Sequence, residues 1–148
     1  MFKKITLITT LMSSLLYAEL DWVSFSDAFE KSKSENRPIM VMISREGCDA
    51  CEYMEYLVFD NYDIEEKLNG DFIPVHLDIE KDASTLNAHN LPSFARPTFY
   101  FLRSDGSKIV YPSMNDFKGK RVVGAQNIKD FTITINSVED AYKNGNSN

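Results

Sequence analysis

The spacing of apolar residues along the chain changes between helical and strand-like periods, and these changes outline its elements. Apolar residues at helix-like spacing predict a first helix over Phe25–Glu35, with Ser24 at a capping position. The run Ile39–Ile43 follows and is apolar on both faces, which is typical of a central strand in a parallel-type sheet. The chain thus opens with a helix and a buried strand.

A second helical pattern begins at the two cysteines. Its apolar positions recur at three- and four-residue spacing: Cys51, Met54, Leu57 and Val58. Asn61 ends this helix, Ile64–Leu68 predicts a short further one, and Phe72–Asp78 predicts the next strand. Strand, helix and strand together form a unit whose crossover is expected to be right-handed.

The following segment predicts a turn of helix around Ala83–His89 and a strand at Phe99–Leu102. Ser104–Ser107 carries a hairpin signal, so Lys108–Tyr111 is expected to return as an antiparallel edge strand. Pro112–Gly124 is expected to be a loop.

The last segment fits two periods. An alternating set favours a strand: Phe131, Ile133 and Ile135. A set at helical spacing favours a helix: Ile128, Phe131, Ile135, Val138 and Tyr142. We predict the helix because its set spans four turns, whereas the alternating set covers only five residues.

The first eighteen residues have the features of a signal peptide. Lys3 and Lys4 precede an apolar stretch at Ile5–Leu16, and Ala18 supplies a small residue for cleavage. A stretch of about 12 residues is short for a membrane span, which needs about 20. We therefore expect cleavage after Ala18 and a single domain, residues 19–148, in the periplasm.

Composition narrows the function classes. Apolar residues make up 43% of the chain, as in an ordinary folded domain. At 148 residues we expect a single core, and we expect the protein to be a monomer. The formal net charge of -6 argues against nucleic acid as a partner, because binding to phosphates depends mainly on Lys and Arg.

The two cysteines, Cys48 and Cys51, form one C-x-x-C motif after a buried strand and at the start of a predicted helix. Unpaired N–H groups there stabilise a thiolate, which makes Cys48 the nucleophile and Cys51, one turn inside, the resolving residue. A structural disulfide closing so short a loop would add little stability. Half of a zinc site is the third alternative, but His76 and His89 lie 25 and 38 positions beyond Cys51, a spacing unlike that of a zinc finger, so we expect no metal.

Several segments together resemble a thioredoxin-fold protein, and more narrowly the exported thioredoxin-like thiol:disulfide oxidoreductases of bacteria. The resemblance lies in a proline-led strand, the C-x-x-C motif, a second strand, and a Pro-Thr strand before a turn: Arg37–Ile39, Gly47–Met54, Phe72–Asp78, Arg96–Leu102 and Asp105–Gly106. It implies an α/β thioredoxin fold, with a central mixed β-sheet flanked by helices.

The resemblance also implies roles. Pro97 matches a proline whose cis peptide bond faces the cysteines, and Arg96 would present its backbone to an extended substrate peptide. We expect cysteine-containing protein substrates, no cofactor, and a membrane or exported redox partner. Carboxylates at Glu46 and Asp49 beside Cys48 oppose a thiolate, so we expect a reductant. A redox-inactive peptide-binding module is the alternative.

The sequence departs from typical thioredoxins at three places. Gly47 stands where they carry Trp, Asp49-Ala50 replaces Gly-Pro, and Met42 occupies the position of the buried acid that assists proton transfer. His76, on the neighbouring predicted strand, is our candidate for that proton transfer.

Overall fold

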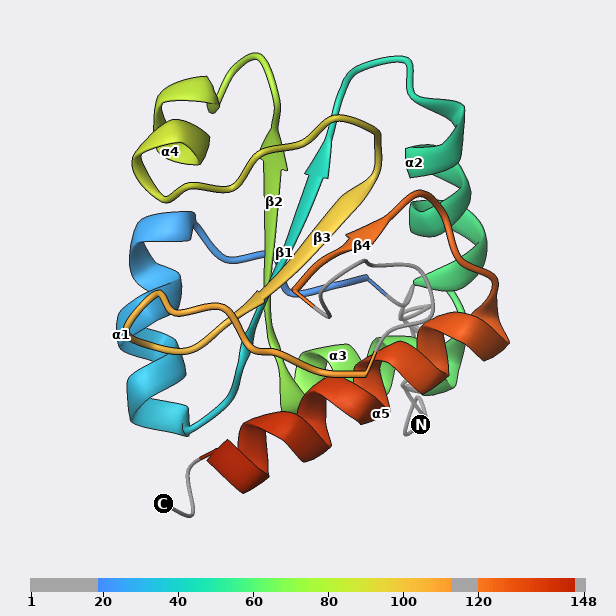
Figure 1. The fold of residues 1–148 in the computed structure, drawn as a ribbon. Helices are drawn as coiled ribbons and strands as arrows, with labels where there is room; N and C mark the ends of the chain where they lie inside the picture. The colour runs from blue at the N-terminus through green and yellow to red at the C-terminus, as the bar shows by residue number, and fades with distance from the viewer. Residues whose placement is uncertain (1–18, 113–119, 146–148) are drawn as a thin grey trace, which may run out of the picture.

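The computed structural model describes residues 19–112 and 120–145, and its centre is a mixed four-stranded sheet. The strands are β1 (Ile39–Ser44), β2 (Ile73–Asp78), β3 (Thr98–Leu102) and β4 (Val122–Val123). They lie in the order β2-β1-β3-β4, with β1 and β2 parallel and the other pairs antiparallel (Figure 1). The expected thioredoxin-type sheet is confirmed.

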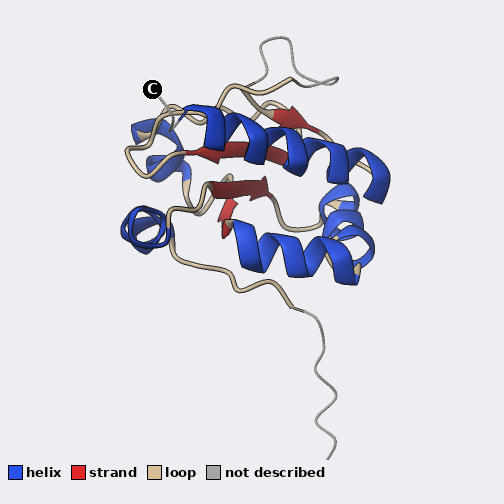
Figure 2. Cartoon of the chain, turned by 90° about the horizontal axis from the view of Figure 1, so that it is seen from below, coloured by secondary structure: helices blue, strands red, loops and turns tan. Residues whose placement is uncertain are grey.

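Helices cover both faces of the sheet. α1 (Phe25–Glu35) and α4 (Ala83–Ala88) lie on one side; α2 (Asp49–Tyr53), its π-helical continuation η1 (Met54–Val58), α3 (Tyr62–Asp71) and α5 (Ile128–Gly145) lie on the other (Figures 1 and 2). None of the helices in the described parts of the chain is both long and apolar enough to span a bilayer.

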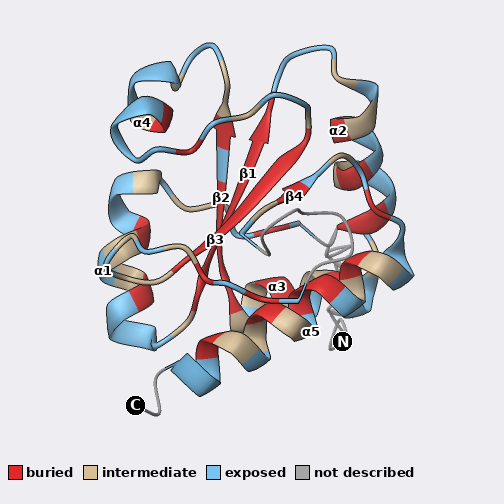
Figure 3. Ribbon diagram, viewed as in Figure 1, coloured by how far each residue is buried: buried red, intermediate tan, exposed pale blue. Residues whose placement is uncertain are grey.

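β1 divides the core into two layers. All six of its residues are buried; Ile39, Val41 and Ile43 pack in the layer under α1, whereas Met40 and Met42 pack in the layer under α2 and α5 (Figure 3). This alternation follows from the period-2 geometry of a strand.

The predicted first helix has the bounds found in the structure. Ser24 is its N-cap and accepts a hydrogen bond from the Asp27 N–H at 3.2 Å. The last segment is a helix, as predicted: Phe131, Ile135, Val138 and Tyr142 are buried, whereas Ile133 of the alternating set is 49% exposed.

Two expectations about the C-terminal half are wrong. Lys108–Tyr111 makes only an isolated bridge, between Lys108 and Leu102. Its Ile109 and Tyr111 side chains pack into the core, Tyr111 against Phe101, whereas Val110 is exposed, so the segment packs on the sheet and does not extend it. The sheet is extended instead by β4, from the stretch expected to be a loop, where Val122 pairs with Phe99. Residues 113–119 of that stretch lie outside the described part, as do residues 1–18 with the expected signal peptide.

The helix after the cysteines also differs from its prediction. Asn61 is the N-cap of α3, which is longer than the predicted Ile64–Leu68. In η1 the Phe59 N–H bonds the Met54 carbonyl at 2.8 Å, and this i+5 hydrogen bond shifts the helix phase. Leu57 is therefore 60% exposed, although the helical spacing placed it in the core.

Gly47 sets the turn that joins β1 to Cys48. Its φ is +70° and no atom lies within 4 Å of an added Cβ. The cost of Gly47→Ala is therefore conformational, about 1–2 kcal/mol of unfolding free energy. Gly70→Ala, inside α3 with equal space, is the matched control and should stabilise by roughly 0.5–1 kcal/mol. Denaturant unfolding of the oxidised variants measures both, and equal changes at the two positions would contradict this account.

Candidate active site

The cysteine motif lies where the turn after β1 leads into α2. Cys48 is the N-cap of α2, and its Sγ accepts the Cys51 N–H at 3.3 Å. Its carbonyl accepts the N–H groups of Cys51 and Glu52 at 2.9 and 3.0 Å. The sulfur of Cys48 thus lies against a backbone donor at the start of a helical segment, as the motif predicted.

The two cysteines form a disulfide, with their Cα atoms 5.2 Å apart. They differ in environment: Cys48 is half-buried, whereas Cys51 is 3% exposed and packs in the core with Met54 and Val58. An external thiol or disulfide therefore has access to Cys48 and not to Cys51. The nucleophilic role of Cys48 and the resolving role of Cys51 stay predictions.

The loop before β3 lies at the same end of the sheet as the cysteines. Thr98 pairs with Ile43 near the end of β1, so Pro97, the residue before it, lies at the end of the sheet from which β1 leads to Cys48. Figure 1 shows the loop before β3 beside the turn between β1 and α2. The Arg96–Pro97 peptide bond is cis, as the resemblance implied. Pro97 is buried and Arg96 is half-buried.

Side chains of β3 hold this loop in place. The Thr98 hydroxyl donates to the Ala95 carbonyl at 2.5 Å, and the Tyr100 hydroxyl donates to the Pro92 carbonyl at 2.6 Å. Both donors are buried. The loop is thereby fixed to the same strand that pairs with β1.

His76 lies on β2 as the register partner of Met42, and its ring faces the helix layer that contains the cysteines. Its Nε2 is 2.5 Å from the Ser44 Oγ and 3.7 Å from a Glu55 carboxylate oxygen. Its ring centroid is 5.2 Å from that of Trp22. The polar neighbours of His76 are thus Ser44 and Glu55, and its part in proton transfer at Cys51 stays a prediction.

Backbone hydrogen bonds order the neighbouring end of β2. The Asp78 carboxylate accepts the N–H of Lys81 at 3.0 Å and of Glu80 at 2.8 Å. These bonds, Lys81 first, hold the pKa of Asp78 below its ordinary value. Among the described residues no group of three or more His, Cys, Asp or Glu side chains is arranged to hold a metal ion.

Comparison with protein families decides the fold family. The model of the thioredoxin-like domain matches residues 25–139, most of the chain. The protein belongs to the thioredoxin-like domain family. The C-x-x-C pair in this protein is therefore a thioredoxin-type pair in its disulfide state.

Solved structures and curated relatives agree with the fold. A thioredoxin from Thermus thermophilus superposes with a TM-score of 0.61 at 20% identity, covering 81% of this chain and 87% of its own. A structure titled DsbH oxidoreductase superposes with a TM-score of 0.61 at 17% identity, covering 90% and 92%. Spermatogenesis-associated protein 20 of Mus musculus is 38% identical over 66 residues, which are 44% of this chain but only 8% of that protein.

A pocket that the sequence does not predict lies beside the cysteine helix. Trp22, Glu55 and Tyr56 are among its lining residues, together with His76. Trp22 precedes α1 and Glu55 lies in η1, so no local spacing joins them. Of the residues that line it, only His76 could be found from the sequence, because alternation along β2 turns its side chain toward η1. Which residues of η1 face the pocket could not be predicted.

Proposed function

We propose that this protein is an exported thiol:disulfide oxidoreductase that exchanges disulfides with protein cysteines. The single observation that supports it most is the asymmetric pair, with an accessible Cys48 at a helix start and a buried Cys51 in disulfide contact. A peptide-binding module without redox chemistry would have no use for this asymmetry.

The reaction runs in two steps. In the reduced protein the Cys48 thiolate attacks one sulfur of a substrate disulfide, and the other substrate sulfur leaves as a thiolate that takes up a proton. Cys51 then loses its proton and attacks the Cys48 sulfur, which releases the second substrate thiol. Two electrons and two protons pass to the substrate, and the protein retains the Cys48–Cys51 disulfide.

Arg96 and Pro97 are the proposed substrate-binding residues. The loop that carries them lies at the cysteine end of the sheet and is held by Thr98 and Tyr100. A substrate segment would lie extended along Arg96, with backbone hydrogen bonds giving affinity independent of its sequence. This binding places the substrate sulfur near Cys48.

The direction we propose is reduction of the substrate. A strong oxidant depends on a stabilised thiolate in its reduced form, and Glu46 and Asp49 place carboxylates next to Cys48. Arg45 and Arg96 oppose this effect, and all four charges are at least partly exposed, so salt weakens each. A reductant outside the cytoplasm needs a membrane or exported partner that returns electrons to Cys48 and Cys51.

The first prediction separates the two cysteines. Cys51→Ser should accumulate mixed disulfides with substrate proteins, because Cys48 can attack but nothing resolves the product. Cys48→Ser should accumulate none. Non-reducing gel electrophoresis with mass spectrometry measures the adducts, and equal trapping by both variants would refute the roles.

A second prediction concerns direction. Equilibration with glutathione should give a reduction potential nearer to about -270 mV, the thioredoxin value, than to the roughly -120 mV of the strongest periplasmic oxidant. A potential above about -170 mV would make the protein an oxidant while leaving the thiol exchange intact.

A third prediction concerns location. Expression of the whole chain in a bacterial host should yield a periplasmic protein whose first residue is Glu19, since Lys3, Lys4 and the apolar stretch before Ala18 form an export signal. N-terminal sequencing of the fractionated protein provides the measurement. Recovery from the cytoplasm with Met1 retained would overturn the export proposal.

A further inference from the structure

A pocket of about 380 Å³ lies on the cysteine side of the sheet, between the segment before α1 and the η1 helix. Three aromatic rings and three carboxylates form most of its lining: Trp22, Tyr56, Phe59, Glu19, Glu55 and Asp60. Trp22 is fixed there by edge contact with Phe59, whose ring centroid is 6.1 Å away. The pocket therefore combines aromatic walls with negative charge, and Trp22 and Phe59 pack on each other whereas Tyr56 is largely exposed.

Among the described residues that line this pocket, none is Lys or Arg. Within that same lining, His76 is the only basic side chain, and its imidazole contacts Ser44 and Glu55. Cleavage after Ala18 would add one positive charge, the α-ammonium group of Glu19. The carboxylates of the pocket would still outnumber that permanent positive charge.

The sequence around the cysteines is also rich in acidic residues. Between positions 46 and 66 the chain carries eight carboxylates and neither Lys nor Arg: Glu46, Asp49, Glu52, Glu55, Asp60, Asp63, Glu65 and Glu66. This excess of negative charge attracts a positively charged partner and accelerates its encounter, and Arg45 and Arg96 beside Cys48 reduce it locally. Glu55 and Asp60 of this segment line the pocket.

The pocket and Cys48 lie on the same helical segment, formed by α2 and η1. Glu55 follows Cys48 by seven residues along α2 and η1, which is about 10 Å at helical rise. A few residues of extended peptide span that distance. A substrate whose disulfide lies at Cys48 therefore can place a neighbouring side chain in the pocket.

We infer that this pocket binds an arginine side chain of the protein substrate and so selects disulfides flanked by basic residues. The inference rests on the proposed function, because the substrate is the one reduced at Cys48. A guanidinium group stacks on aromatic rings such as those of Trp22 and Tyr56. It also forms a bidentate ion pair with a carboxylate such as that of Glu55. Lysine lacks the planar fork and binds more weakly.

The test uses three peptides with the same internal disulfide, flanked by arginine, glutamine or glutamate. The reduced protein should reduce the arginine peptide fastest and the glutamate peptide slowest, with a gap of about fivefold or more at low salt that narrows at high salt. Equal rates for all three peptides would overturn the inference while leaving the proposed function intact.

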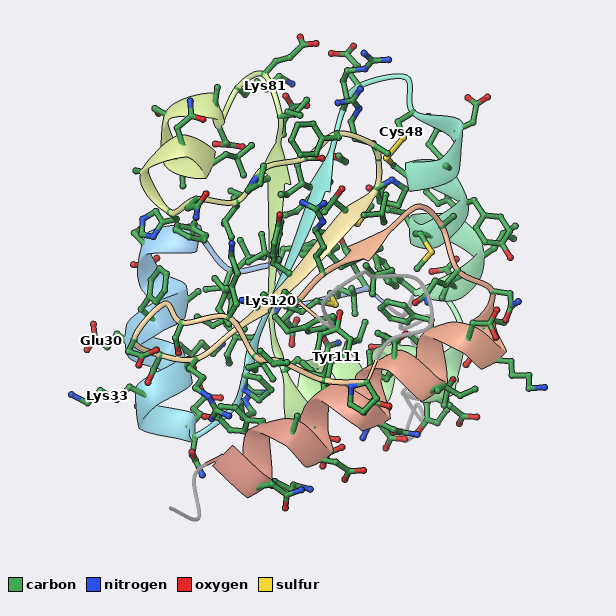
Figure 4. All side chains as sticks on the ribbon, in the orientation of Figure 1. Glu30, Lys33, Cys48, Lys81, Tyr111 and Lys120 are labelled. Carbon is green, nitrogen blue, oxygen red and sulfur yellow. A yellow bond between two sulfur atoms is a disulfide. The ribbon has the colours of Figure 1, made fainter. Side chains whose placement is uncertain are left out.

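Matched variants locate the effect. Glu55→Gln should lower the preference for the arginine peptide about threefold, and Tyr56→Ala should lower it through the lost ring. Glu30→Gln removes the same charge from α1, on the opposite side of the molecule from Cys48 (Figure 4), and should leave the preference unchanged. Equal changes in Glu55→Gln and Glu30→Gln would contradict a role for the pocket.

A second readout is independent of thiol chemistry. Trp22 is the single tryptophan of the chain, so its fluorescence reports on the pocket. The arginine peptide with serines in place of its cysteines should give a saturable change that Glu55→Gln weakens and the glutamate version lacks. A saturable change without reduction of any peptide would refute the proposed function alone, and its absence would refute the inference.

Discussion

Burial of β1 on both faces is the constraint on which the rest of the structure depends. Each of its six residues is inaccessible, and its two sets of alternating side chains form the two layers of the core. The strand therefore cannot shift or slip without exposing one whole layer. Its C-terminal end is fixed in space, and Gly47 turns the chain there into the helix that begins after Cys48.

The same strand positions the second half of the site. β3 pairs antiparallel with β1 from Ile39 to Ile43, so its first residues lie beside the last residues of β1. This pairing brings Pro97 and Arg96, the proposed substrate-binding residues, to the end of the sheet where the cysteines lie, although they are far from them in the sequence. Thr98 and Tyr100 then anchor the loop from within the core.

The sequence predicts those parts of the structure that are determined by neighbouring residues in the chain, and not those determined by contacts between distant segments. The first helix, β1 and the cysteine turn were predicted because capping, apolar runs and motif order are local signals. β4 was missed because Val122 and Val123 form too short a strand, and only pairing with Thr98 and Phe99 defines it. The phase change in η1 and the pocket at Trp22 depend on contacts between distant segments. For the same reason the helical spacing wrongly placed Leu57 in the core, where the structure shows it exposed.

The central claim is that Cys48 is a reactive, accessible thiol and Cys51 its protected partner. The most direct measurement is alkylation of the mildly reduced protein near neutral pH, with mass spectrometry to identify the modified residue over time. This account predicts rapid modification of Cys48, and of Cys51 only after unfolding. Slow modification of both cysteines, or modification of Cys51 first, would contradict it.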